Sequence, residues 1–158
     1  MSNGWGVPSA DLVALSREMV LAGGAVFILL LDAFVPRLRR LSVPLALLVV
    51  VAAGMMAESA PDSTSFGGLL VQTETTTLFG SILLVAAVLS LLASNGFLRR
   101  YGLPSGEYAA LMLWCAAGML LMMRATELLT IFVALELFSI CLYALAGYHR
   151  RTSMATEA

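Results

Sequence analysis

Glu136 is the residue of this sequence that most clearly could do chemistry, because it is a carboxylic acid inside an apolar run over residues 128–147. A helix of about twenty residues spans the hydrocarbon core of a bilayer, so the carboxyl is predicted to lie near the midplane. An ionisable group at that depth is costly and usually serves a function. A buried carboxyl can also take up and release a proton when its surroundings change. The pattern therefore predicts a proton-carrying acid.

The helical face around Glu136 carries two further polar groups. With 3.6 residues per turn, Ser139 and Tyr143 share this face, together with Leu129, Phe132 and Ile140. A hydroxyl and a phenol can hold water or hydrogen-bond the acid, so the face is interpreted as the start of a polar path. We expect it to point inward. The alternative is a structural acid that is hydrogen-bonded to a neighbouring helix or paired with an arginine.

The other acidic candidates are weaker. Glu107 follows Ser105 in the first turn of an expected helix, where a helix N-terminus favours a carboxylate, so capping is the alternative to a functional role. Glu127 has the same alternative. The remaining charges next to apolar runs are expected to be interfacial: Arg17, Glu18 and Asp32.

The composition indicates that these residues belong to a membrane protein. Of 158 residues 60% are hydrophobic and only 12% are charged, and the mean hydropathy is +0.93. Soluble domains are about 25% charged. The net charge is −1 and all nine basic residues are arginine, which leaves no basic tract for nucleic acid. Cys115 and Cys141 lie in apolar runs, which favours buried thiols over a disulfide or a metal pair.

The elements that must position these residues are predicted from five apolar segments. They indicate an all-α membrane protein, a single polytopic bundle of about five transmembrane helices. The second and fourth segments are short for a full span, which tilt and bilayer mismatch tolerate. The expected helices cover residues 19–35, 41–57, 78–97, 108–123 and 128–147.

The arginines predict the orientation of the bundle. Seven of nine lie in connections on one side: Arg37, Arg39, Arg40, Arg99, Arg100, Arg150 and Arg151. The other side has the acidic connection 58–77 and the turn with Arg124. The positive-inside rule then places the N-terminus outside and the C-terminus in the cytoplasm. Arginine without lysine, in a sequence rich in Ala, Gly and Val, is typical of a GC-rich bacterial genome, which favours the bacterial plasma membrane. The five segments then predict a multi-pass protein.

The last third of the sequence resembles a known family. Residues 107–151, EYAALMLWCAAGMLLMMRATELLTIFVALELFSICLYALAGYHRR, look like the fourth and fifth helices of the subunit N family of proton-pumping NADH-quinone oxidoreductase, respiratory complex I. The matching features are EY at a helix start, GMxLM at its end, ELLTIF after a short turn, and then LELFSxxLYxLAGYxR. The earlier segment LLLDAFVP is similar to the N-terminal region of that family.

The resemblance implies an antiporter-like fold in which Glu136 matches a fifth-helix glutamate. In the family this glutamate works with buried lysines on later helices, and the pair moves protons while electrons pass from NADH to quinone elsewhere. No cofactor is then expected in this chain, because NADH, FMN, iron-sulfur clusters and quinone belong to the whole complex. The implied partners are other membrane subunits of complex I and the lipid bilayer, without nucleic acid.

The sequence also departs from the family. Family members have many more helices, arranged in two inverted repeats, and this sequence contains no lysine. We therefore expect an N-terminal portion that is inactive alone, with the remainder missing or present as a separate polypeptide. Two other functions stay open, a cation/proton antiporter subunit of the same fold and a small non-catalytic membrane scaffold or assembly protein.

Overall fold

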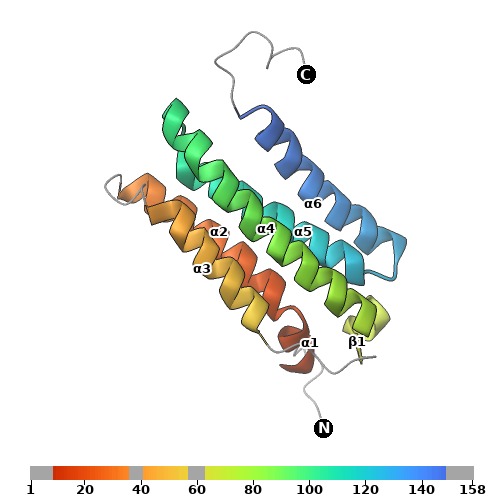
Figure 1. The fold of residues 1–158 in the computed structure, drawn as a ribbon. Helices are drawn as coiled ribbons and strands as arrows, with labels where there is room; N and C mark the ends of the chain where they lie inside the picture. Colours follow the sequence, from red (N-terminus) through yellow and green to blue (C-terminus); the bar gives the residue numbers. More distant parts are fainter. Residues whose placement is uncertain (1–8, 36–40, 57–62, 149–158) are drawn as a thin grey trace.

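The computed structural model describes residues 9–35, 41–56 and 63–148, which form a bundle of antiparallel neighbouring helices. The five long helices are α2 (Ser16–Phe34), α3 (Ser42–Met55), α4 (Glu74–Tyr101), α5 (Ser105–Arg124) and α6 (Leu128–Ala146). Successive helices run in opposite directions, so α2 begins at one end of the bundle and α6 finishes at the other (Figure 1). A helix thus lies at each of the five expected segments, and the prediction of an all-α fold is confirmed.

Helix α5 is the centre of the bundle. It packs against α2, α3, α4 and α6, whereas α6 packs chiefly against α5 alone. The close approach depends on small buried residues of α5, including Ala109, Ala116, Ala117 and Gly118. A side-chain carbon at Gly118 would lie only 3.0 Å from the backbone nitrogen of Phe138 on α6. The helix that carries Glu136 is therefore held from one side only.

Apolar side chains fill the core and also cover much of the outside. The largest fully buried ones are Leu21, Ile28, Val50, Leu91, Leu98 and Leu113. Large exposed hydrophobic residues are found on every long helix except the central α5, such as Leu48 on α3, Val85 on α4 and Leu129 on α6. Helices that are apolar on all sides suit a lipid solvent.

Three of the described helices are long and apolar enough to cross a membrane, namely α4, α5 and α6. Helix α3 is apolar but has only 14 residues, and α2 carries Arg17, Glu18 and Asp32 within its 19 residues. The coarse assignment to a membrane protein is therefore supported, while a total of five spans stays a prediction.

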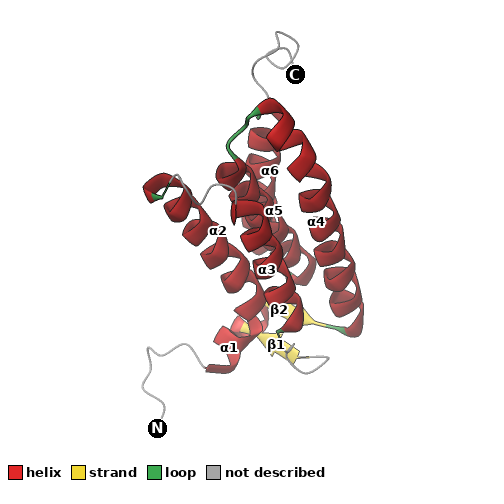
Figure 2. Ribbon diagram, turned by 60° about the vertical axis from the view of Figure 1, so that its left-hand side comes forward, coloured by secondary structure: helices red, strands yellow, loops and turns green. Residues whose placement is uncertain are grey.

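The connection between α3 and α4 holds structure that the sequence did not lead us to expect. Strands β1 (Ser63–Ser65) and β2 (Leu70–Gln72) pair antiparallel around a short 3-10 turn, η2 (Phe66–Gly68), and lie near the short helix α1 (Ser9–Ala14) (Figure 2). Helix α4 begins at Glu74, earlier than the expected residue 78, because Thr73 caps it: Thr76 N–H donates to Thr73 Oγ1 at 3.2 Å.

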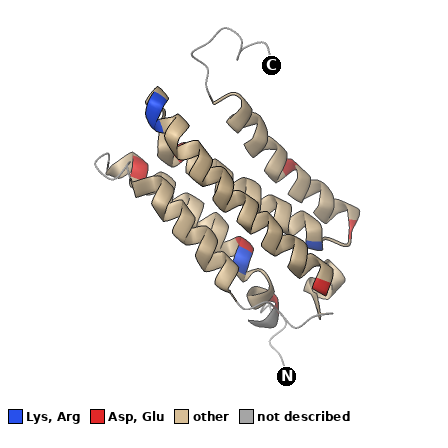
Figure 3. Cartoon of the chain, viewed as in Figure 1, with Lys and Arg blue, Asp and Glu red and all other residues tan. Residues whose placement is uncertain are grey.

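The charged residues gather mainly at the two ends of the bundle (Figure 3). Arg99 and Arg100 are in the last turn of α4, and Arg124 ends α5 at the opposite end. The other arginines used for the orientation lie outside the described residues: Arg37, Arg39, Arg40, Arg150 and Arg151.

Candidate functional site

Glu136 lies near the middle of α6, flanked on both sides by apolar turns. Figure 3 shows an acidic residue at this point of the helix, far from the charged ends of the bundle. The helix begins at Leu128, directly after Glu127, which makes no side-chain cap hydrogen bond. Glu136 thus lies midway along its helix as its sequence context predicts, and its depth in a bilayer stays a prediction.

The face of Glu136 points away from the described bundle, so the expectation that it points inward is wrong within these residues. Glu136 is exposed, Leu129 and Tyr143 are 71% and 76% exposed, and Ser139 is half-buried. The buried residues of α6 are Ala134 and Cys141, which belong to the side that meets α5. Helical spacing predicts which residues share a face, but α6 is apolar all round, so spacing alone cannot tell which face is covered.

Glu136, Ser139 and Tyr143 share a face without being joined. In the part of the chain that the structure describes, Glu136 makes no hydrogen bond or ion pair, and neither hydroxyl is bonded to it. The proton path suggested for these three groups therefore stays a prediction, and any polar partner of the acid must be supplied from elsewhere.

Glu107 belongs to a different cluster, which joins the end of α6 to the start of α5 and to the last part of α4. Tyr148 O–H donates to the carbonyl of Pro104 and, at 3.4 Å, to Glu107 Oε2. The Tyr108 ring meets Tyr148 edge-on at 5.5 Å, and the Tyr108 hydroxyl lies 2.8 Å from that of Ser94. Burial and the carboxylate of Glu107 raise the pKa of Tyr148, which keeps its donating proton in place.

Asp32 is buried at the same end of the bundle, against the first turn of α5. A side-chain carbon at Gly106 would lie 2.6 Å from Asp32 Cβ and Cγ, so only glycine lets the carboxyl sit there. The N-cap of α5 is Pro104, whose side chain has no hydrogen-bond acceptor to cap the helix. The carboxylate of Asp32 therefore complements the partial positive charge of this helix end.

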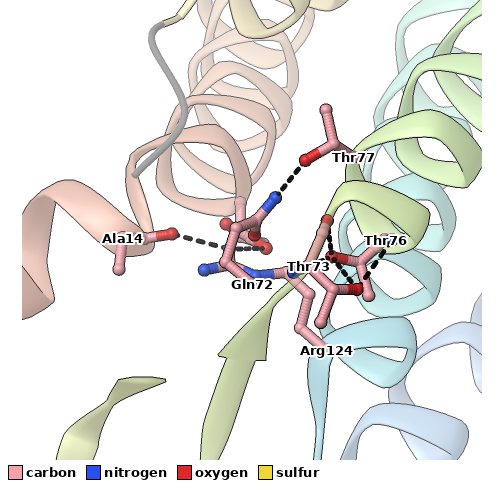
Figure 4. A network of polar contacts seen from close by, with 7 residues as sticks. Ala14, Gln72, Thr73, Thr76, Thr77 and Arg124 are labelled. Atoms are coloured by element: carbon pink, nitrogen blue, oxygen red, sulfur yellow. Dashed lines mark hydrogen bonds and ion pairs between the residues drawn. The ribbon is translucent and has the colours of Figure 1, made fainter. Parts of the chain in front are cut away.

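A buried ion pair at the opposite end was missed from the sequence. Arg124 Nη1 donates to Glu18 Oε1 at 2.9 Å and to the carbonyl of Ala14 at 2.6 Å, with side chains only 8% and 9% exposed (Figure 4). The predicted orientation had put Arg124 at the same end as the start of α2, which is the signal that could have suggested this pair.

The surroundings of the pair are polar as well. Gln72 of β2 is buried and donates to Thr77 Oγ1 at 2.7 Å. A cavity of about 20 Å³, room for one water molecule, is bordered by Glu18, Arg124, Gln72 and Thr76 among others. Thr126 N–H donates to the carbonyl of Leu69 at 3.0 Å, so the turn before α6 is fastened to the hairpin. This cluster fixes the start of the helix that carries Glu136.

Among the described residues, no group of three or more His, Cys, Asp or Glu side chains could hold a metal ion. Cys115 and Cys141 are buried free thiols.

Comparison with known proteins confirms the resemblance found in the sequence. The chain is 34% identical over 153 residues to NADH-quinone oxidoreductase subunit N of Xanthomonas euvesicatoria pv. vesicatoria, covering 95% of this chain and 31% of the relative. It is 35% identical over 151 residues to the subunit N of Trichlorobacter lovleyi, with 94% and 31% covered. The match to Myxococcus xanthus subunit N is 34% over 154 residues, with 94% and 30% covered. The chain spans about a third of the length of these curated relatives, and no family model matches it.

Proposed function

We propose, from the relationship of this chain to NADH-quinone oxidoreductase subunit N along nearly its whole length, that it is a membrane subunit of a proton-translocating NADH-quinone oxidoreductase. Within that subunit, Glu136 is the proton-carrying acid. The observation that carries this proposal is an acid midway along an apolar helix, on a face that no described element covers.

The open face needs a partner, because an ionisable side chain left in lipid at a helix centre costs about 2.5 to 3.5 kcal/mol. A segment that covers this face and brings a cation to Glu136 would offset that cost. In the subunit N family the cation is a lysine, and residues 1–158 contain none. The partner therefore lies outside these residues, on the remainder of the same subunit or on another membrane subunit of the complex.

The proposed mechanism uses the approach and withdrawal of this cation. A nearby cation stabilises the carboxylate and favours release of the proton. When the cation moves away, the acid is left in a low-dielectric site, which favours its protonated form. Ser139 and Tyr143, on the same face, can hold water that carries the proton onward toward the end of α6. Electron transfer from NADH to quinone, with its flavin and iron-sulfur groups, takes place in other subunits.

Replacement of Glu136 tests the role of its carboxyl. In membranes that contain the assembled complex, Glu136→Gln and Glu136→Ala are expected to lower quinone-linked NADH oxidation at least about tenfold, in keeping with the loss of one acid–base group. Glu136→Asp keeps an acid with a shorter reach and should retain part of the rate. Glu127→Gln is the matched control, because Glu127 is an exposed acid just before the same helix. A full rate in Glu136→Gln would contradict the proposal.

The assembly itself is tested by purifying the native chain with whatever accompanies it and identifying the mixture by mass spectrometry. We expect the membrane and redox subunits of an NADH-quinone oxidoreductase. If the chain purifies with ion-antiporter subunits and without redox subunits, its function is that of an antiporter subunit. If it purifies without partners, the result favours a scaffold.

A further inference from the structure

A cavity of about 640 Å³ opens at the end of the bundle where α4 finishes and α3 and α5 begin. It is lined by the first turns of α3, the last turns of α4 and the connection 102–105 into α5. Its volume falls within the range of about 300 to 1,000 Å³ that small-molecule sites occupy. It lies at the opposite end from the Glu18–Arg124 pair and on different helices from Glu136.

The lining of this cavity is partly apolar and partly polar. Val43 and Leu98 are buried beneath the lining, and the apolar surface open to a ligand belongs to Pro44, Leu47 and Leu103. The polar side chains from α4 are Asn95 and Arg99, and neither makes a hydrogen bond or ion pair with the described residues. A guanidinium, an amide and an apolar surface are therefore available together.

The electrostatics of the cavity favour an anion. None of the residues that line it is acidic. Helix α3 begins beside it, and its N-cap, Leu41, offers no side-chain acceptor for the first N–H groups of the helix. These N–H groups carry partial positive charge, which adds to the charge of Arg99. The N-terminus of α5 already faces the carboxylate of Asp32, so α3 and Arg99 supply the attraction.

We propose that this cavity binds an anionic phospholipid, with the headgroup phosphate on Arg99 and an acyl chain along Pro44, Leu47 and Leu103. Arg99 is in the last turn of a helix that is long and apolar enough to cross a membrane, which places it at the depth of lipid headgroups. The apolar part of the lining matches an acyl chain, which a free inorganic anion does not have. This inference depends on the bundle lying in a membrane and not on the proton chemistry of Glu136.

Lipid retention by the purified full chain tests the site, with Arg100 as a matched control. Arg100 is the next residue, is exposed and does not line the cavity. In native mass spectrometry with phosphatidylglycerol and phosphatidylcholine of identical acyl chains, the wild type should retain phosphatidylglycerol preferentially. Arg99→Gln should lower that preference about fivefold, the effect of one arginine near a lipid surface. Arg100→Gln and Arg99→Lys should keep it.

Two further measurements separate a lipid from other ligands. Leu47→Trp fills the apolar part of the cavity without changing charge, and it should lower lipid retention as Arg99→Gln does. Inorganic phosphate at millimolar concentration should leave the bound phosphatidylglycerol in place. The proposal is overturned if Arg99→Gln and Arg100→Gln behave alike, if the wild type shows no preference for the anionic lipid, or if phosphate displaces the lipid.

Discussion

Arg124 connects three segments that are remote in the sequence. One of its nitrogens, Nη1, donates to Glu18 at the start of α2 and to the last carbonyl of α1, while the turn that follows it is bonded to the hairpin. A buried ion pair contributes little net stability compared with an apolar replacement, but breaking it leaves a charge without compensation. The pair therefore serves mainly to fix the position of these helix ends relative to one another.

A double-mutant cycle measures the coupling energy between Glu18 and Arg124. Glu18→Gln alone should lower the free energy of unfolding by about 3 to 5 kcal/mol, because it leaves the buried Arg124 without its carboxylate. Arg124→Gln should cost less, because Arg17 also interacts electrostatically with Glu18. The double variant should lose clearly less than the sum of the two. Reversible unfolding of the chain in detergent gives the three values. If the two single effects simply add, the contact between Glu18 and Arg124 does not couple them.

These residues also show what the sequence could predict at this scale. Glu136 stands out because a carboxyl inside a long apolar run has few ordinary explanations. Glu18, Arg124 and Asp32 could not be assigned, because a charge near a helix end is equally compatible with water, a headgroup or a buried partner. Only the packing of α2 against α5 shows that the three side chains are buried.

At the scale of elements, α6 depends on one neighbour. The residue range of α6 was predictable from hydrophobicity, and so were the approximate limits of the other long helices. The hairpin was not, because strands of three residues in a polar stretch have no periodicity to recognise. The covered side of α6 could not be predicted either, since it is set by the small residues of α5 and not by a polar stripe on α6.

Substitution of Gly118 tests the α5–α6 contact. The added carbon of Gly118→Ala would meet Phe138 N at 3.0 Å and Ala134 O at 3.2 Å, which are backbone atoms and move only with the whole of α6. We expect a loss of about 1 to 3 kcal/mol in the free energy of unfolding. Gly96→Ala in α4 is the control, because no atom lies within 4 Å of its added carbon. Equal stability of both variants would contradict the contact.

At the scale of the molecule, the distribution of arginines along the whole sequence predicts the orientation. Among the described residues, Arg99 and Arg100 share one end with Asp32 and Glu107, and Arg17 and Arg124 lie at the other end. The asymmetry therefore comes from the five arginines outside the described residues. By the positive-inside rule the end with the paired arginines is cytoplasmic.

Cysteine labelling can test this orientation. With Cys115 and Cys141 replaced by alanine, Tyr101→Cys and Glu127→Cys place exposed thiols at opposite ends of the bundle. A membrane-impermeant maleimide should label Glu127→Cys in intact cells and Tyr101→Cys only in inverted vesicles. The reverse pattern would contradict the orientation and would also move the proposed lipid site to the outer leaflet.

The proposed role of Glu136 is tested most directly by proton uptake into inverted membrane vesicles energised with NADH. The quantity to measure is the number of protons moved per NADH oxidised, in wild type, Glu136→Gln and Glu127→Gln, each with its assembly checked on a native gel. We predict that Glu136→Gln assembles but moves markedly fewer protons, whereas Glu127→Gln equals the wild type. An assembled Glu136→Gln complex with the wild-type rate and ratio would contradict the account.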